Sequence, residues 1–268
     1  MTTKVRLCLT LTAFCLLTNP LRAQLIGITW AQGELYSISP IDASVQFIGS
    51  TGLTLPDSLE FGPGGRLFTT TNGIEPLTSE LYEINPANAA AALIGPTGVP
   101  QFEGALAFAP DGTAYGGASF PTNIYTIDIQ TGQATILGSI GDDVNGMVYR
   151  SDGKLVAFGA IKGFYSIDLE TLATTTIAQL PAMQGIGGMT VWNGDGYLIA
   201  RRRAEQVDSL FKINLFNGEL SLVGKIDLGE PASFFGWFSG LAAAPVPEPA
   251  SVGLFIVAML WSSHRLRF

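Results

Sequence analysis

Reactive side chains other than carboxylates are scarce in this chain. Its only histidine, His264, lies close to the C-terminus, and its only cysteines, Cys8 and Cys15, lie close to the N-terminus. The long middle of the chain therefore excludes a Ser-His-Asp triad, a cysteine nucleophile and a histidine-based or thiolate metal site. No GxxxxGK[ST] sequence or dinucleotide-type glycine fingerprint follows a strand pattern and opens a helix pattern. We expect no catalytic residue, no cofactor and no metal.

Carboxylate and amide side chains recur just before apolar segments, where they can act together at one site. They are Asp57, Glu60, Glu103, Asp142, Asp143, Asn145, Gln184 and Glu230, and an aromatic run at 234–238 follows the last of them. Paired carboxylates hydrolyse glycosidic bonds, carboxylate and amide oxygens hold calcium, and exposed aromatic clusters stack on sugar rings. The predicted ligand-binding residues are Asp57, Glu103, Asp142, Asp143, Asn145 and Trp237. The alternative is that these side chains are polar because they are solvated.

Five stretches of similar sequence show which elements position these side chains. They are LYSISP from Leu35, LYEINP from Leu81, IYTIDI from Ile124, FYSIDL from Phe164 and LFKINL from Leu210, at spacings of 46, 43, 40 and 46 residues. Each is followed by a polar turn and a second apolar run, and its residues alternate in character, as at Tyr125, Ile127 and Ile129. Alternation with a period of two predicts strands, so each repeat contains a hairpin.

A second hairpin precedes the first in four of the repeats. Its sequences are LEFGPGGRLF, LAFAPDGTAY, MVYRSDGKLV and TVWNGDGYLI. Asp-Gly and Gly-Gly supply the positive φ of a tight turn. Four short antiparallel strands in about 40 to 47 residues match the size of a propeller blade. The candidate side chains lie in loops that enter each blade's first strand, and such loops converge at one mouth of the central channel.

The first repeat begins at its second strand, which indicates how the ring closes. Residues 25–30 align with the second strand of the fourth repeat, whereas residues 241–245 copy residues 106–110 of an inner strand. Pairing of 241–245 beside 25–30 leaves no blade edge open. We therefore predict an all-β fold, a five-bladed β-propeller over residues 24–245, closed by pairing of its N- and C-terminal strands.

The pattern FAPDG, IYTID and TGQATILG resembles bacterial extracytoplasmic propellers with NHL-like and YVTN-like repeats. The strand position of WD repeats carries no Trp-Asp dipeptide here, and no double glycine of the kelch type occurs in every blade. The resemblance spans residues 25–245, and it implies the fold rather than a function.

Residues 24–245 are strongly acidic. They contain nine Lys and Arg against 21 Asp and Glu, a net charge of −12. A surface that tracks phosphates has the opposite sign, so we do not expect nucleic acid as a partner. The one basic run, Arg201, Arg202 and Arg203, is interpreted as part of a solvated hairpin, with contact to an anionic polysaccharide as the alternative.

The N-terminus has the layout of a secretory signal peptide. Lys4 and Arg6 precede an apolar segment at 7–17, and the small residue Ala23 follows it. We predict a signal peptide over residues 1–23 with cleavage after Ala23, which removes both cysteines. The alternative, a buried N-terminal helix, leaves the leading cations and Pro20 unexplained.

The C-terminus resembles a bacterial sorting signal. VPEPAS at 246–251 is followed by ten unbroken apolar residues, 252–261, and then by Arg265 and Arg267. The apolar segment is short of the ~20 residues of a membrane span, and the arginines fit the positive-inside bias. This arrangement resembles the PEP-CTERM signal of Gram-negative bacteria that make extracellular polysaccharide, although that family commonly has a denser arginine cluster. The resemblance implies recognition near Pro247, Glu248 and Pro249 by a membrane enzyme, an exosortase. An ordinary membrane anchor is the alternative.

Together these patterns predict three parts: a signal helix over 1–23, the propeller over 24–245, and a sorting or anchor segment with a short hydrophobic helix over 246–268. We expect export through the inner membrane, transient anchoring there, and a final place at the cell surface or in the extracellular matrix. The expected partners are an exosortase-type enzyme and an extracellular polysaccharide or a surface protein. The expected function is non-enzymatic binding of carbohydrate or protein. The alternative is a polysaccharide hydrolase that uses loop carboxylates at the mouth.

Overall fold

The computed structural model of the protein describes residues 24–73, 77–159, 162–180, 183–202, 205, 207–229 and 237–245. The predicted signal helix, the predicted C-terminal helix and the residues Pro247, Glu248 and Pro249 lie outside these ranges, so they stay predictions. Within the ranges, the helical element is a short 3₁₀ turn, η1 (Pro63–Gly65). No helix of the described residues is long and apolar enough to span a membrane.

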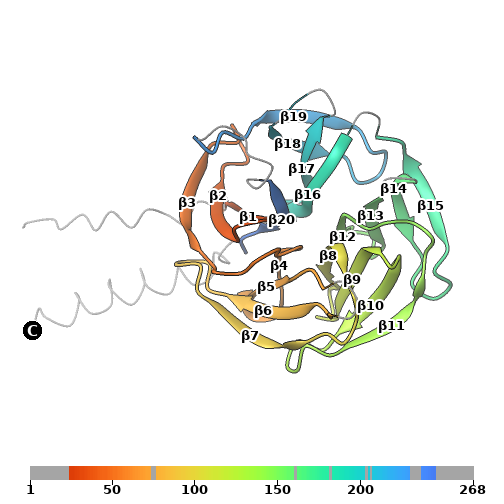
Figure 1. Cartoon of the computed structure of the whole chain (residues 1–268). Coiled ribbons are helices and arrows are strands. Elements are labelled where there is room, and N and C mark those ends of the chain that lie inside the picture. Colours follow the sequence, from red (N-terminus) through yellow and green to blue (C-terminus); the bar gives the residue numbers. More distant parts are fainter. Residues whose placement is uncertain are drawn as a thin grey trace, which may run out of the picture.

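The strands form five antiparallel sheets of four strands each, arranged as blades around a central axis (Figure 1). From the inner to the outer strand, blade 1 consists of β20 (Phe238–Ala243), β1 (Leu25–Thr29), β2 (Glu34–Ile38) and β3 (Val45–Ser50). Blade 2 consists of β4 (Glu60–Phe61), β5 (Leu67–Thr70), β6 (Glu80–Ile84) and β7 (Ala91–Pro96). Blade 3 consists of β8 (Phe102–Phe108), β9 (Ala114–Phe120), β10 (Asn123–Ile127) and β11 (Ala134–Ser139). Blade 4 consists of β12 (Gly146–Tyr149), β13 (Leu155–Gly159), β14 (Gly163–Ile167) and β15 (Thr174–Ala178). Blade 5 consists of β16 (Met183–Trp192), β17 (Asp195–Arg202), β18 (Asp208–Ile213) and β19 (Leu220–Lys225). The all-β, five-bladed propeller predicted from the repeats is therefore confirmed.

The composition of each strand follows its distance from the axis. In blade 4 every residue of β13, LVAFG, is buried, because neighbouring blades cover both faces of the sheet. The outer strand β15, TTTIA, is half-buried or exposed along its whole length. A continuous apolar run is typical of a strand covered on both faces, and threonine-rich sequence suits an edge strand that contacts water.

The Asp or Asn that directly follows the third strand of four blades has a structural role. Its side-chain oxygen accepts a hydrogen bond from the backbone N–H two residues later. These pairs are Asn85 with Ala87 (2.9 Å), Asp128 with Gln130 (2.9 Å), Asp168 with Glu170 (3.0 Å) and Asn214 with Phe216 (2.9 Å). Such Asx turns tighten the connection to the outer strand. The most regular polar positions of the repeat are therefore turn residues rather than site residues.

The ring closes where the two ends of the propeller meet in blade 1. Strand β20 pairs antiparallel with β1, in a register that places Leu25 opposite Ala243 and Gly27 opposite Leu241. The backbone N–H of Ala244 also donates to the carbonyl of Gln24 at 3.0 Å. The predicted pairing of residues 241–245 beside residues 25–30 is confirmed, and no inner edge of blade 1 is left open.

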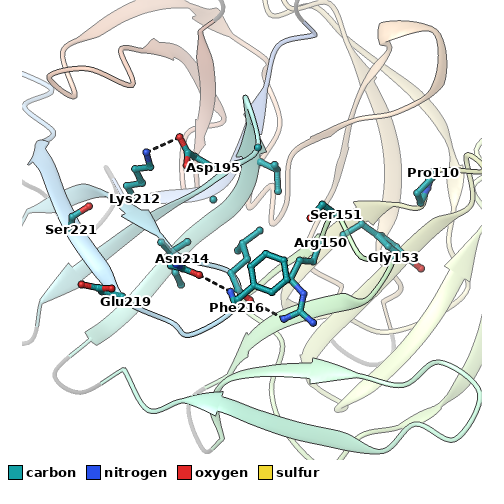
Figure 2. Close-up of a pocket in the computed structure, with 16 residues that line it drawn as sticks. Pro110, Arg150, Ser151, Gly153, Asp195, Lys212, Asn214, Phe216, Glu219 and Ser221 are labelled. Carbon is teal, nitrogen blue, oxygen red and sulfur yellow. Dashed lines mark hydrogen bonds and ion pairs between the residues drawn. The ribbon is translucent and has the colours of Figure 1, made fainter.

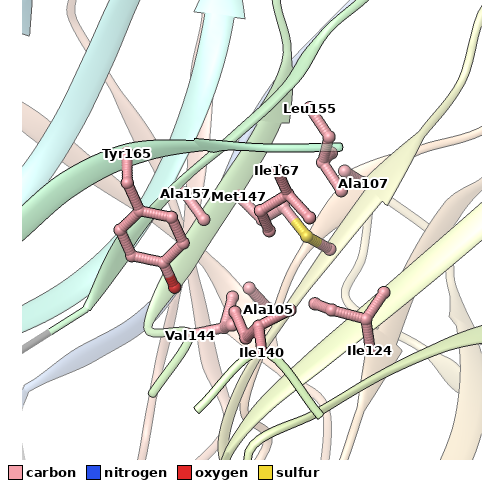
Figure 3. Packing of buried hydrophobic residues seen from close by; sticks show 10 residues of the cluster. All are labelled: Ala105, Ala107, Ile124, Ile140, Val144, Met147, Leu155, Ala157, Tyr165 and Ile167. Carbon is pink, nitrogen blue, oxygen red and sulfur yellow. The ribbon is translucent and has the colours of Figure 1, made fainter. Parts of the chain in front are cut away.

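The hydrophobic core lies between the blades. The cluster between blades 3 and 4 contains Ile124 of β10 on one side and Tyr165 on the other, with Val144 and Met147 between them (Figure 3). Val144 belongs to the loop that enters β12, and it is fully buried against the position of Gly117, where a Cβ atom would come within 2.8 Å. The core thus anchors the loop that enters β12, and the polar residues next to Val144 in this loop are held at one end of the channel.

Candidate functional site

The loops that enter the inner strands surround a cavity of about 580 Å³ at one end of the channel. Its lining comes from all five blades and includes both aromatic and polar side chains: Trp30, Asp57, Phe102, Glu103, Asp143, Asn145, Phe158, Arg201 and Trp237. We call this cavity the mouth. Next to it, the starts of the inner strands leave a gap of only about 10 Å³, whose lining includes the glycines Gly104, Gly146 and Gly240. Five of the six predicted ligand-binding residues line the mouth, and the sixth, Asp142, does not.

Asp57 supports the mouth from underneath. Its side chain is 2% exposed, and one carboxyl oxygen accepts hydrogen bonds from Gln101 Nε2 at 3.1 Å and from the backbone N–H of Gly104 at 2.6 Å. Gln101 is in turn fixed by the hydroxyl of Tyr125, which donates to its amide oxygen. Burial raises the pKa of Asp57 to about 8. Because it is buried and hydrogen-bonded to Gln101 and Gly104, this carboxyl positions the loop of blade 3 rather than presenting a charge to a ligand.

Glu103 is the carboxylate that this network presents to solvent. Its backbone φ is +48°, a conformation that residues with a side chain rarely adopt. Two flanking hydrogen bonds maintain it: the Glu103 N–H donates to Asn72 Oδ1 at 3.0 Å, and the next N–H, that of Gly104, donates to Asp57. A strained residue held by dedicated partners is a candidate for function.

An amide connects Glu103 to the loop of blade 4. Asn145 Nδ2 donates to Glu103 Oε2 at 3.4 Å and to Ser119 Oγ at 2.9 Å. Although Glu103 as a residue is exposed, burial around its carboxylate raises its pKa, and the Asn145 hydrogen bond opposes that shift. The predicted residues Glu103 and Asn145 thus form one hydrogen-bonded unit at the mouth.

The two neighbouring aspartates of blade 4 have different roles. Asp142 is fully buried, and its carboxylate accepts the backbone N–H groups of Lys162 at 2.7 Å and Asp143 at 2.9 Å. It therefore organises the loops that enter β12 and β14. Asp143 lines the mouth, and its carbonyl oxygen accepts the hydroxyl of Tyr165 at 2.9 Å. Sequence spacing could not separate the two, because adjacent residues in a loop can point in opposite directions.

A buried ion pair holds the closing strand at the mouth. Arg201 is 5% exposed, forms a 2.9 Å salt bridge with Asp208, and lies with its guanidinium 3.5 Å from the centre of the Trp237 ring. The other carboxyl oxygen of Asp208 accepts the backbone N–H of Phe238 at 2.9 Å. Two successive residues, Trp237 and Phe238, are therefore fixed by this pair as the chain enters β20.

The interpretation of Arg201, Arg202 and Arg203 as a solvated run is wrong for its first member. Arg201 sits directly opposite Asp208 in the β17–β18 ladder, which buries it as half of an ion pair. Arg202 is exposed, with its guanidinium 5.2 Å from the Phe211 ring centre, and Arg203 lies outside the described residues. Within the described part of the chain, Arg201 Nε is buried and has no hydrogen-bond partner.

Of the remaining candidates, the structure describes Glu60, which is not among the residues that line the mouth. Glu60 lies in β4 opposite Phe68, its carboxylate accepts the N–H of Phe61 at 2.9 Å, and burial raises its pKa to about 8. The side chain of Gln184, the residue Glu230 and positions 234–236 lie outside what the structure describes. Among the described residues, no group of three or more His, Cys, Asp and Glu side chains is arranged to hold a metal ion.

Sequence reasoning missed Asp208 and Trp30. Trp30 lines the mouth, and its backbone N–H donates to the carbonyl of Trp237 at 2.6 Å. Its position just after the strand at 25–29 was a usable signal, since the closing strand had to arrive beside it. Asp208 could have been found from strand register, because it begins the strand that pairs with the one ending near Arg201.

Comparison with known proteins identifies the class of fold. No protein-family model matches the sequence, and no curated protein matches it. Similar solved structures include a nidogen/laminin complex, with 10% identity, a TM-score of 0.55, and 84% of this chain and 99% of that chain covered. A structural genomics protein of unknown function from Bacteroides thetaiotaomicron VPI-5482 has 14% identity, a TM-score of 0.53, and coverage of 81% and 64%. TolB from Acinetobacter baumannii has 14% identity, a TM-score of 0.50, and coverage of 84% and 67%.

At these identities the likeness concerns the fold alone, and it agrees with the propeller resemblance noted in the sequence. The protein is a five-bladed β-propeller. Its mouth is an aromatic and acidic cavity with a buried arginine at one side.

Proposed function

We propose that the protein is an exported, exosortase-sorted propeller whose mouth binds carbohydrate in the extracellular matrix without hydrolysing it. The observation that carries this proposal is the combination of Trp30 and Trp237 with Glu103, Asn145 and Arg201 around one cavity. The export and sorting parts rest on the sequences of residues 1–23 and 246–268.

The chemistry of the mouth suits a polyhydroxylated ligand. Indole faces stack on the C–H faces of sugar rings, while carboxylate and amide groups exchange hydrogen bonds with hydroxyls. The volume of about 580 Å³ lies within the range of roughly 300–1,000 Å³ that small-ligand sites occupy. A surface protein is the second ligand class, and the nidogen/laminin complex among the similar folds is an example of a propeller structure solved as a protein complex.

A polysaccharide hydrolase is the alternative function. Of the predicted carboxylates, Asp57 and Asp142 are almost fully buried, and their oxygens accept backbone N–H groups, which leaves little of either group available to a substrate. Glu103 and Asp143 remain in one cavity, and the raised pKa of Glu103 is the specific observation that favours a general acid. We favour binding because the same carboxylate is exposed and bound by Asn145.

A glycan panel assayed for both binding and products separates these functions. We expect saturable binding of a subset of polysaccharide-derived glycans, without release of reducing ends. Trp237→Ala should weaken that binding about tenfold, since it removes a stacking face from the cavity. Phe120→Ala is the matched control, because Phe120 is 72% exposed and lies outside the mouth, and it should bind like the unmodified protein.

Two other results would overturn carbohydrate binding without hydrolysis as the function. Product formation that is lost in Glu103→Gln would establish the hydrolase. An absence of binding across the panel, with both variants folded, would remove carbohydrate as the ligand and leave a protein partner.

A further inference from the structure

A second cavity, of about 600 Å³, lies between blades 4 and 5 (Figure 2). It is lined by the turn between β12 and β13, by the turn between β16 and β17, and by the turn between β18 and β19. These turns are at the opposite ends of the strands whose entry loops form the mouth. This cavity, which we call the groove, therefore opens on the other face of the wheel.

An exposed aromatic ring lies at the groove, in contact with a cation. Phe216 is 60% exposed, and the guanidinium of Arg150 lies 4.5 Å from its ring centre. Arg150 is itself fixed by two hydrogen bonds to Asp152, at 2.9 and 2.7 Å, and by one to the carbonyl of Leu215 at 3.1 Å. One ring face is thus covered by a cation that has its own partners, and the rest of the ring contacts solvent. A preorganised aromatic surface loses little entropy when a ligand stacks on it.

The other repeats supply an internal comparison. The positions equivalent to Phe216 in the four other outer turns are Ile41, Ala87, Gln130 and Glu170, and those equivalent to Arg150 in the other inner hairpins are Gly62, Ala109 and Asn193. The combination of a cation and an aromatic ring at these two positions therefore occurs at the boundary between blades 4 and 5 and at none of the other positions compared. The other blade boundaries are built without this pair, so it is not a general requirement of the repeat.

The polar groups around the groove are largely neutralised by one another. Lys212 Nζ lies 2.6 Å from Asp195 Oδ2, with both side chains 45% exposed, and Arg150 is paired with Asp152. Glu219, Ser151 and Ser221 add a carboxylate and hydroxyls to the lining. An ionic ligand would have to break these pairs, whereas a neutral ligand rich in hydroxyls can use their remaining hydrogen-bonding capacity.

We propose that the groove is a second binding site and that it takes a neutral saccharide stacked on Phe216. The protein then has carbohydrate sites on both faces of the wheel and can bridge two glycan chains. Bridging adds avidity without any new contact at either site. The groove site goes beyond the proposed mouth site and does not depend on it, whereas the bridging of two glycan chains also rests on the proposed function of the mouth.

Titration with cellohexaose, a neutral hexasaccharide, tests the groove, with backbone amide NMR shifts as the readout. The proposal expects saturable shifts around Phe216, Ser221 and Lys212. Phe216→Ala should weaken this binding at least about threefold, from loss of the aromatic contact alone. Ile41→Ala truncates the equivalent exposed turn residue of blade 1, 77% exposed, and should leave the shifts unchanged.

The same titration separates the two sites. If Trp237→Ala removes all binding and Phe216→Ala changes nothing, the groove proposal is overturned and the mouth proposal stands. If shifts at the groove persist in Trp237→Ala and vanish in Phe216→Ala, the groove is established whatever the mouth binds. Absence of shifts around Phe216 in the unmodified protein overturns the groove.

Discussion

Leu241→Asp is expected to leave the propeller unfolded or open. Leu241 is 1% exposed, lies opposite Gly27 in the closing pair, and packs in a cluster with Leu25 and Ile199. Truncating a buried leucine costs about 2–5 kcal/mol. Burying an unpaired carboxylate in its place costs more. Since domains of this kind are stable by about 5–15 kcal/mol, the substitution removes much or all of the free energy of unfolding.

Urea unfolding followed by tryptophan fluorescence measures this effect. Leu222→Asp is the matched control, because it makes the same chemical change on the outer strand β19 at a side chain that is 50% exposed. It should alter the free energy of unfolding by no more than about 0.5 kcal/mol. Equal unfolding midpoints for the two variants would mean that Leu241 is not part of a buried closing strand.

Arg201→Met is expected to lower the free energy of unfolding by about 3–5 kcal/mol, the usual cost of removing one partner of a buried ion pair. It leaves the carboxylate of Asp208, 8% exposed, without its cation. It also removes the guanidinium that supports the Trp237 ring. Ligand binding at the mouth should weaken together with stability, because Trp237 and Phe238 lose a common support.

Two further variants isolate the ion pair. Asp208→Asn combined with Arg201→Met should restore part of the lost stability, since the unpaired charge is then gone. Lys212→Met removes an exposed partner of Asp195, with both side chains 45% exposed, and should cost less than about 1 kcal/mol. A loss for Arg201→Met no larger than that for Lys212→Met would contradict the role assigned to Arg201.

The five-bladed architecture was predictable because every repeat has the same pattern of strands and turns. Alternating residues and turn glycines defined the hairpins, and the missing first strand of the first repeat predicted that β20 would pair with β1. Loop position predicted the convergence of Glu103, Asn145 and Trp237, since every loop that enters an inner strand reaches the same face. These inferences needed only local pattern and the geometry of a closed ring.

What the sequence did not reveal depends on the direction of individual side chains. Asp142 and Asp143 look equivalent in a sequence, but only Asp143 lines the mouth, because Asp142 caps the backbone of Lys162. Arg201 looked solvated in a basic run, but strand register places it against Asp208. The groove is a similar case: Arg150 and Phe216 are far apart in the chain, and they meet only because adjacent blades place their turns side by side.

Closure by the two ends of the propeller is the central structural claim, and an engineered disulfide tests it most directly. The N–H of Ala244 donates to the carbonyl of Gln24, and Cα atoms of such antiparallel pairs are about 5.5 Å apart, within the range of about 4.4–6.8 Å that a disulfide bridges. In a chain that begins at residue 24, no other cysteine is present.

The measurement is the free-thiol content of the folded double variant Gln24→Cys with Ala244→Cys after mild oxidation. We predict an intramolecular disulfide, with both thiols lost and the protein still monomeric. In the control variant the second cysteine is placed at position 109, which is the equivalent position in blade 3, instead of at position 244. This variant, Gln24→Cys with Ala109→Cys, should keep both thiols free. Free thiols in the folded Gln24 and Ala244 variant would contradict the closed ring.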